Sequence, residues 1–332
     1  MNARAWAGLG LVMAGGLGLA AVRFATRRGS VAMLDATDRV FAGGDRAIRL
    51  ACSAQYGPDA AQCLQVFVPA AAALDPARTG RALPVIAFIH GGGWASGAPH
   101  DYRFVARMLA PHGYAVVLAG YRLHPDARYP AMLEDGAAAL GWIAAQAGAW
   151  GGDAHRVVVM GHSAGAYNAA MLGLDRRWRQ AGVPPPCGIV GLAGPYDFLP
   201  LDDHSTIATF GHVADLRETQ PIAHVHGTAP PLLLIHGADD RRVRPRHSLA
   251  LARALASCGA RSETHVLPGI GHEGLIMRFA HPFARDRRAL AHVLDFLARS
   301  TAPGSSGLPP AEAPPNGATT GRASAPVQTA QR

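Results

Sequence analysis

The stretch "VVVMGHSAGAYNAA", Val157 to Ala170, runs from a β-branched apolar tract through Gly-His-Ser-Ala-Gly into an alanine-rich segment. The tract predicts a buried strand and the alanine-rich segment predicts a helix. Ser163 lies in the turn between them, where Gly161 and Gly165 let strand and helix pack closely around a serine at strained φ/ψ. In a chain with 39 glycines this five-residue pattern also arises by chance, so its meaning depends on the segments around it.

Composition limits the classes of protein to consider. The chain has 332 residues, of which 49% are hydrophobic and 16% charged, so it can bury a large core in one α/β domain or two smaller ones. The formal net charge is +8, but the basic residues are all arginines spread along the chain, with no long basic tract and no interleaved aromatics. This distribution argues against a nucleic-acid partner.

Apolar runs of strand length alternate with segments of helical spacing, and each run ends in a loop of glycine, histidine or aspartate. This alternation predicts a mostly parallel sheet with helices on both faces. In such sheets ligands bind at the carboxyl ends of the strands, which is where the polar residues cluster. The predicted strands are 84–90, 114–121, 156–162, 189–194, 231–237 and 263–269.

Ser163 needs two partner residues to act as a nucleophile. A serine hydroxyl is a weak nucleophile at neutral pH, so a base must take its proton and an acid must orient that base. Asp240 and His272 each follow a predicted strand and come after Ser163 in the chain, which makes them the candidate acid and base. Asp239 competes with Asp240, because one residue of register decides which carboxylate points inward, and Asp197 is a weaker competitor.

The glycine-rich stretch "HGGGW", His90 to Trp94, directly follows the first predicted strand of the parallel series. Backbone N–H groups in such a loop can stabilise the oxyanion of acyl transfer without side-chain bulk. No Gly-Lys-[Ser/Thr] and no G-x-G-x-x-G fingerprint follows, which excludes a phosphate-binding loop. We expect Gly92 and Gly93, with Gly91 behind them, and the N–H of Ala164 to form the oxyanion hole.

These motifs, in this order, carry a family resemblance. From Ala47 to Arg299 the chain resembles the α/β-hydrolase esterase and lipase group that includes hormone-sensitive-lipase-like carboxylesterases, kynurenine formamidases and feruloyl or acetylxylan esterases. The matching stretches are "HGGGW", "YRLHPDARYPAMLEDGAAALGWI", "GGDAHRVVVMGHSAG", "GPYDF", "HGADDRRV" and "GIGHEG", and "YGPDAAQCLQVFVPA" resembles the early antiparallel strands of the group.

The resemblance implies an α/β-hydrolase fold with a mostly parallel eight-stranded sheet, helices on both faces and a small cap or none. It also implies hydrolysis of carboxylic esters, with Ser163 acylated, His272 acting as base and then acid, and Asp240 fixing the imidazole.

The residues that line the substrate pocket are harder to predict from the sequence. Residues 199–227 form the only insertion that we expect to shape the acyl pocket, and it is too short for a deeply buried triacylglycerol, so small to medium acyl chains are expected. Trp94 and Tyr196 are candidate substrate-binding residues, although an aromatic beside a strand end is more often core packing. Glu134 and Asp135 are candidates to brace the oxyanion loop, with a position on the helix surface as the commoner outcome.

The chain divides into three parts. Residues 1–28 form a hydrophobic N-terminal segment, residues 29–300 the catalytic domain, and residues 301–332 a Pro/Gly/Ser/Ala-rich tail that we expect to be disordered. The uncharged run 5–22 is about long enough for a membrane anchor, and the arginines after it place the domain weakly on the cytoplasmic side. A cleaved signal, with a secreted or periplasmic domain, is the alternative. A short linker is expected between this run and Arg49.

The cysteines and histidines do not suggest a metal site. The four cysteines lack C-x-x-C pairing and the histidines lack ligand spacing, so we expect no metal and no cofactor. Cys52 and Cys63 flank a turn-like segment, which permits a disulfide across a hairpin, but two buried free thiols are the preferred reading. The oligomeric state does not follow from the sequence.

Three functions therefore stay open. The first is a serine carboxylesterase acting on a small-molecule ester. The second is an arylformamidase that cleaves an N-formylkynurenine-type amide with the same three side chains. The third is a non-catalytic hydrolase-fold module that is anchored at a membrane and binds a ligand; such modules typically lack one of the three side chains.

Overall fold

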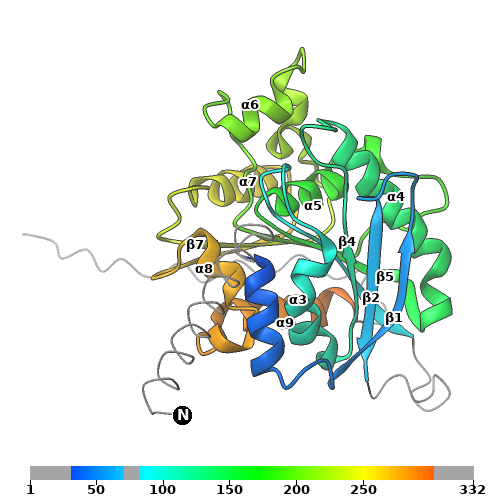
Figure 1. Ribbon diagram of the computed structural model, residues 1–332. Helices are drawn as coiled ribbons and strands as arrows, with labels where there is room; N and C mark the ends of the chain where they lie inside the picture. Colours follow the sequence, from blue (N-terminus) through cyan, green and yellow to red (C-terminus); the bar gives the residue numbers. More distant parts are fainter. Residues whose placement is uncertain (1–30, 71–81, 303–332) are drawn as a thin grey trace, which may run out of the picture.

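The computed structural model describes residues 31–70 and 82–302. In this part of the chain, eight strands form one sheet in the order β1-β2-β4-β3-β5-β6-β7-β8 (Figure 1). β1 pairs antiparallel with β2 and β2 with β4, whereas all other neighbours are parallel. The strands are β1 (Ile48–Gln55), β2 (Cys63–Pro69), β3 (Leu83–Ile89), β4 (Ala115–Ala119), β5 (Gly152–His162), β6 (Gly188–Leu192), β7 (Leu232–Gly237) and β8 (Ser262–Leu267).

Helices cover both faces of this sheet. One face packs against α3, α8, α9 and the helical residues 31–41, here called helix 31–41, and the other face packs against α4, α5 and α7. Because both faces are covered, β4 and β6 are buried at every residue, as expected for apolar strands in a parallel sheet. The helices are α3 (Arg103–Leu109), α4 (Ala131–Gln146), α5 (Ala164–Leu174), α6 (His204–Phe210), α7 (Arg246–Ser257), α8 (His272–Met277) and α9 (Arg288–Ser300).

The sequence-based strands are confirmed. Each of the six predicted runs overlaps one observed strand of the parallel series, with ends that differ by four residues or fewer. The two antiparallel strands at the start of the sheet also agree with the family resemblance. The α/β-hydrolase fold is therefore the fold of the described residues, and the core lies in the two layers between sheet and helices.

The alternative of a disulfide across the first hairpin is wrong. Cys52 stands opposite Val66, and Cys63 stands opposite Gln55, so the two thiols are not cross-strand neighbours. All four cysteines are free, and they are half-buried rather than fully buried.

The linker expected before Arg49 is also wrong in part, because residues 31–41 form a helix on the sheet's α3 side. The hydrophobic segment 1–28 and its run 5–22 lie outside the described residues, as does the predicted tail from residue 303 onward. Within the described ranges, no helix combines the length and the apolar character needed to cross a bilayer.

Candidate active site

Ser163 lies in the turn between the end of β5 and the start of α5. Its φ of 54° and ψ of −121° form a strained backbone conformation that projects the hydroxyl above the sheet edge. A Cβ at Gly165 would lie 2.1 Å from the carbonyl oxygen of Ile89, and one at Gly161 would lie 2.2 Å from that of Gly165. These two positions therefore require glycine, as the sequence predicts.

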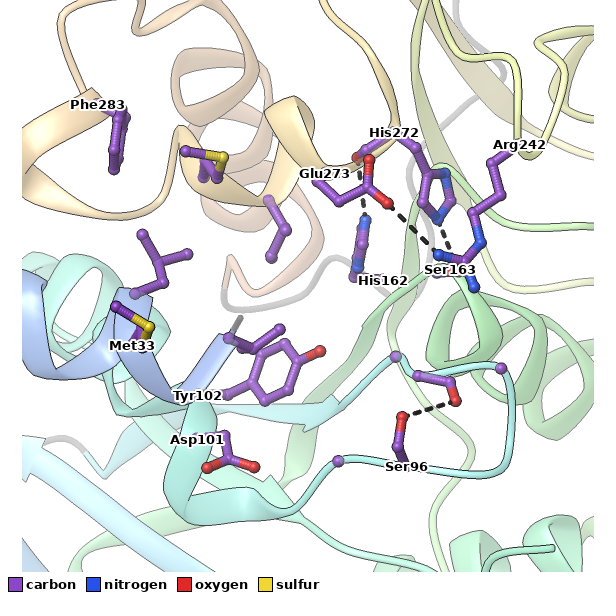
Figure 2. A pocket seen from close by; sticks show the side chains of 18 of the residues that line it. Met33, Ser96, Asp101, Tyr102, His162, Ser163, Arg242, His272, Glu273 and Phe283 are labelled. Carbon is purple, nitrogen blue, oxygen red and sulfur yellow. Dashed lines mark hydrogen bonds and ion pairs between the residues drawn. The ribbon is translucent and has the colours of Figure 1, made fainter. Parts of the chain in front are cut away.

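The three side chains proposed from the sequence form a hydrogen-bonded chain, of which Figure 2 shows Ser163 and His272. Ser163 Oγ lies 2.9 Å from His272 Nε2, and His272 Nδ1 lies 2.7 Å from Asp240 Oδ2. His272 begins α8 and Asp240 follows β7, so the turns after β5, β7 and β8 supply one member each. A hydroxyl that donates to an imidazole, which in turn donates to a carboxylate, is the geometry that activates a serine nucleophile.

Asp240 is held as an anion inside the protein. Its other oxygen, Oδ1, accepts hydrogen bonds of 2.9 Å from the backbone N–H groups of Arg242 and Val243. Burial raises the pKa of Asp240, but the hydrogen bonds from His236 and His272 outweigh this effect and hold the pKa below its ordinary value. Asp239, the competitor, has an exposed side chain, so the register favours Asp240.

A fourth residue, which the sequence did not single out, contacts the acid. His236 is fully buried at the end of β7, with Nε2 at 2.7 Å from the carbonyl oxygen of Val243 and 3.3 Å from Asp240 Oδ2. Because a carbonyl only accepts, Nε2 carries a hydrogen there, while Nδ1 faces the Ser248 hydroxyl at 2.8 Å. The only sequence signal was its position four residues before Asp240, in a chain with 16 histidines.

The loop after β3 places backbone donors beside the nucleophile. Gly92 and Gly93 have φ of 120° and 60°, and a Cβ at Gly92 would lie 2.0 Å from the carbonyl oxygen of Ser96. Among the described residues, no hydrogen bond occupies the N–H of Gly92 or Gly93. Gly91 packs against His162, and Ala164 is the first residue of α5, whose N–H has no intrahelical partner.

Two neutral histidines support this arrangement. Burial lowers the pKa of His162 to about 3, with the nearby His272 as a second cause, and burial lowers the pKa of His90 to about 4. His162 Nε2 faces the carbonyl oxygen of His272 at 3.4 Å. The ring of His90 stacks on Tyr121 at a centroid distance of 4.5 Å, which fixes the start of the glycine loop.

The expectation of a surface position on the helix holds for Glu134 and is wrong for Asp135. Asp135 is buried, and its carboxylate accepts hydrogen bonds from the backbone N–H of Arg122 at 2.7 Å and from the Gln62 amide at 2.7 Å. Arg122 directly follows Tyr121, so this carboxylate ties down the loop after β4 that carries the ring stacked on His90.

A cavity of about 710 Å³ opens at Ser163. One wall comes from the glycine loop, and the other comes from helix 31–41, α8 and the 3-10 turn η8 (His281–Phe283). Figure 2 shows Met33 and Phe283 on the side of the cavity away from Ser163. The apolar side chains of this wall are Val31, Met33, Leu34, Ile276, Met277 and Phe283.

The sequence did not predict which segments line this cavity. Residues 199–227, expected to shape the pocket, contribute none of its lining, so that expectation is wrong. Trp94 and Tyr196 are buried and do not line the cavity either. The Trp94 ring packs edge-on against Tyr167 and Phe210 at centroid distances of 5.3 and 4.9 Å, on the side of the core away from the cavity.

No group of three or more His, Cys, Asp or Glu side chains in the described ranges is arranged to hold a metal ion. The described residues place a serine, an imidazole, a carboxylate and backbone donors beside a cavity with an apolar wall. Such a set can attack a carbonyl carbon, stabilise the resulting oxyanion and transfer a proton to a leaving group.

Curated relatives match most of this chain. Esterase LipC of Mycobacterium tuberculosis (strain ATCC 25618 / H37Rv) is 30% identical over 243 residues, which cover 65% of this chain and 58% of LipC. The probable isoprenylcysteine alpha-carbonyl methylesterase ICMEL1 of Oryza sativa subsp. japonica is 26% identical over 260 residues, which cover 71% of this chain and 60% of that protein. The chain thus spans less than two thirds of the length of these relatives.

Solved structures and a family model agree with the fold. A truncated form of a carbohydrate esterase from gut microbiota superposes with a TM-score of 0.67 at 19% identity, covering 78% of this chain and 98% of that one. The model of the BD-FAE family matches residues 73–255, which are more than half of the sequence. The chain therefore belongs to the BD-FAE family, and its fold is that of the α/β-hydrolases.

Proposed function

We propose that this protein is a serine hydrolase that cleaves carboxylic esters of small to medium acyl chains through an acyl-enzyme intermediate. The observation that carries the proposal is the unbroken hydrogen-bond chain from Ser163 through His272 to Asp240, at 2.9 and 2.7 Å, beside a cavity with a largely apolar wall. The names of the two curated relatives, an esterase and a probable methylesterase, support the same chemistry.

In the first half of the reaction, Ser163 Oγ attacks the ester carbonyl carbon while its proton passes to His272 Nε2. The carboxylate of Asp240 stabilises the imidazolium that forms. The negative oxygen of the tetrahedral intermediate accepts hydrogen bonds from the N–H groups of Gly92, Gly93 and Ala164. The bond from carbon to the alcohol oxygen then breaks, and His272 returns the proton to the leaving alcohol.

In the second half, His272 takes a proton from water, and the resulting hydroxide attacks the acyl carbon on Ser163. The second tetrahedral intermediate collapses, Ser163 Oγ regains its proton from His272, and the carboxylic acid leaves. Because His162 stays neutral, its ring, whose centroid lies 5.1 Å from that of His272, adds no positive charge there when the His272 ring becomes charged.

The ester is favoured over a formyl amide. The cavity wall beyond Ser163 is built mainly from aliphatic, thioether and aromatic side chains, which suits an alkyl or acyl group. An aryl formamide, the second candidate, has no supporting name among the two curated relatives. A ligand-binding module without catalysis is disfavoured because all three side chains of the relay are present and in contact.

Turnover of p-nitrophenyl acetate and butyrate, with N-formylkynurenine beside them, tests this proposal. We expect wild-type protein to hydrolyse the nitrophenyl esters and Ser163→Ala to lower kcat by about 10⁴-fold or more. Ser257→Ala, an exposed serine on α7, is the matched control and should keep wild-type rates. Wild-type turnover no higher than that of Ser163→Ala on every substrate would overturn the proposal, and preference for the formamide would reassign the substrate.

We further propose residues 29–300 as the catalytic unit and residues 5–22 as a membrane attachment with the domain on the cytoplasmic side. The support is the uncharged run and the three arginines that follow it within the first 28 residues. Fractionation of the full chain tests this: anchored protein stays in the membrane pellet through a carbonate wash. Release of a shortened protein into the medium or periplasm would indicate a cleaved signal instead.

A further inference from the structure

The two aspartates of helix 31–41 lie on the side that faces the protein, whereas Arg39 is exposed and pairs with Asp45 at 3.7 Å. Arg107 of α3 is buried, and its guanidinium reaches Asp35 and Asp38 at 2.5 Å each and Asp45 at 2.9 Å. Asp38, which is fully buried, also accepts from the backbone N–H and the ring of His281, at 2.6 and 2.9 Å. The helix is therefore fixed to α3 on one side and to the turn after α8 on the other (Figure 1).

The outward face of the same helix is apolar. Met33, Ala36, Thr37, Val40 and Phe41 follow the spacing i, i+3, i+4, i+7 and i+8, which places them on one face. Val40 is 78% exposed, Phe41 67% and Met33 37%, and the Thr37 hydroxyl donates back to the Met33 carbonyl at 2.8 Å. A surface helix normally presents mainly charged residues to water, whereas Arg39 is the single charged residue among the exposed side chains of helix 31–41.

This apolar face is continuous with the lining of the cavity. Met33 and Thr37 line the cavity as well as the outward face, and Phe283, which is 38% exposed, stands across from Met33 (Figure 2). Arg285 and Arg287 follow shortly after Phe283; both are exposed and have no ion-pair partner among the described residues. An apolar rim with free cations beside it fits the interface between acyl chains and anionic headgroups.

We propose that the outward face of helix 31–41, together with Phe283, rests on a lipid bilayer, and that bilayer-dissolved esters enter the cavity there. The sequence just before the helix supports a bilayer as the occupant: it holds the uncharged run 5–22 and three arginines that end three residues before Val31. A membrane attachment so close to the helix holds this face at the headgroup level. The inference rests on the proposed esterase activity for its substrate, but not for the contact itself.

Full-length protein mixed with phosphatidylcholine vesicles, with and without one quarter phosphatidylglycerol, tests the contact. The readout is the rate on p-nitrophenyl octanoate with vesicles divided by the rate without them, beside the rate on water-soluble p-nitrophenyl acetate. The variant is Val40→Asp with Phe41→Asp, two residues outside the cavity lining. The matched control is Ile207→Asp, because Ile207 is 52% exposed on α6, at the far end of the molecule in Figure 1.

We expect vesicles to raise the octanoate rate of wild type and of Ile207→Asp. In the double variant the ratio of the rates with and without vesicles should be about tenfold smaller, while the acetate rate stays unchanged. Anionic vesicles should give the larger gain. An equal gain in the double variant would overturn the proposal. Light scattering that shows a dimer of the wild type without lipid and a monomer of the double variant would also overturn it, since the face would then bind a second copy. If the wild type does not hydrolyse the acetate, the esterase activity is refuted but the membrane contact is not. The contact is then tested by whether vesicles slow hydrogen exchange at the backbone N–H of Phe41.

Discussion

His236 Nε2 lies 3.3 Å from Asp240 Oδ2, the same oxygen that accepts the hydrogen bond of His272 at 2.7 Å. The carboxylate is therefore contacted by an imidazole on each side, one of which leads to Ser163 and the other to the Ser248 hydroxyl. His236 does not reach the cavity, so it acts through Asp240 as a positioning residue.

Replacing His236 tests this role. In His236→Leu, Oδ2 of the buried Asp240 loses one donor, and the Val243 segment, whose N–H holds Oδ1, loses its tie to position 236, so the carboxylate is oriented less firmly toward His272. We expect kcat on p-nitrophenyl butyrate to fall about 10- to 100-fold with KM nearly unchanged. His236→Gln, which can still donate a hydrogen bond, should recover part of the loss. His247→Leu, a buried histidine on α7 without contact to Asp240, controls for packing; an equal loss of kcat there would contradict the positioning role.

Adjacent aspartates provide a sharper comparison. Asp240→Asn removes the anion that stabilises the His272 imidazolium, and we expect kcat to fall about 10⁴-fold. Asp239→Asn changes an exposed side chain one residue away and should leave kcat within about threefold of wild type. Steady-state kinetics on p-nitrophenyl acetate measures both. A large loss in Asp239→Asn with a small one in Asp240→Asn would reverse the assignment of the acid.

The sequence predicted those parts of the molecule that have local signatures. A strand followed by a glycine-flanked serine, or by an aspartate, indicates its own position in a parallel sheet, and the strands and the turns carrying Ser163, Asp240 and His272 follow from that rule. The orientation of helix 31–41 has no such signature. Its inward face is selected by Arg107, which is 69 residues from Asp38 in the chain, and the cavity wall depends on that long-range ion cluster.

Trp94 shows the same limit at the scale of one residue. It directly follows the glycine loop, which made it a candidate to line the pocket. Its backbone has φ of 58°, and its ring packs into the aromatic cluster with Tyr167 and Phe210 while its indole N–H lies 3.2 Å from Asn168 Oδ1. The direction of the side chain is thus set by a loop conformation that the sequence alone does not specify.

The ion cluster around Arg107 predicts a large stability effect. Arg107→Met leaves the fully buried Asp38 without its main countercharge, and we expect the free energy of unfolding to fall by about 3–5 kcal/mol. Urea unfolding followed by circular dichroism measures this. Arg107→Met with Asp38→Leu should recover part of the loss, because no unpaired charge is then buried. Arg288→Met, which breaks an exposed pair with Asp286, is the control; a loss as large as that of Arg107→Met would show that burial is not the cause.

The buried histidines make stability depend on pH. The pKa of His162 is lowered to about 3 and that of His90 to about 4, in both cases first by burial, whereas the unfolded chain titrates near 6.5. Below pH 6.5 these histidines therefore bind protons in the unfolded state but stay neutral in the folded state. The stability contributed by neutral burial is complete above pH 6.5 and is lost as the pH falls toward the folded pKa values.

Between pH 7 and pH 5 we expect each of these two histidines to lower the free energy of unfolding by about 2 kcal/mol. Urea unfolding at half-unit steps between pH 7 and 5 measures the slope, in a window above the range where most carboxylates titrate. His162→Gln keeps a donor toward the His272 carbonyl but cannot be protonated, so its curve should fall less steeply than that of wild type. His155→Gln, at an exposed position, should keep the wild-type slope. If His162→Gln also keeps the wild-type slope, His162 is not the buried neutral group whose protonation drives the loss.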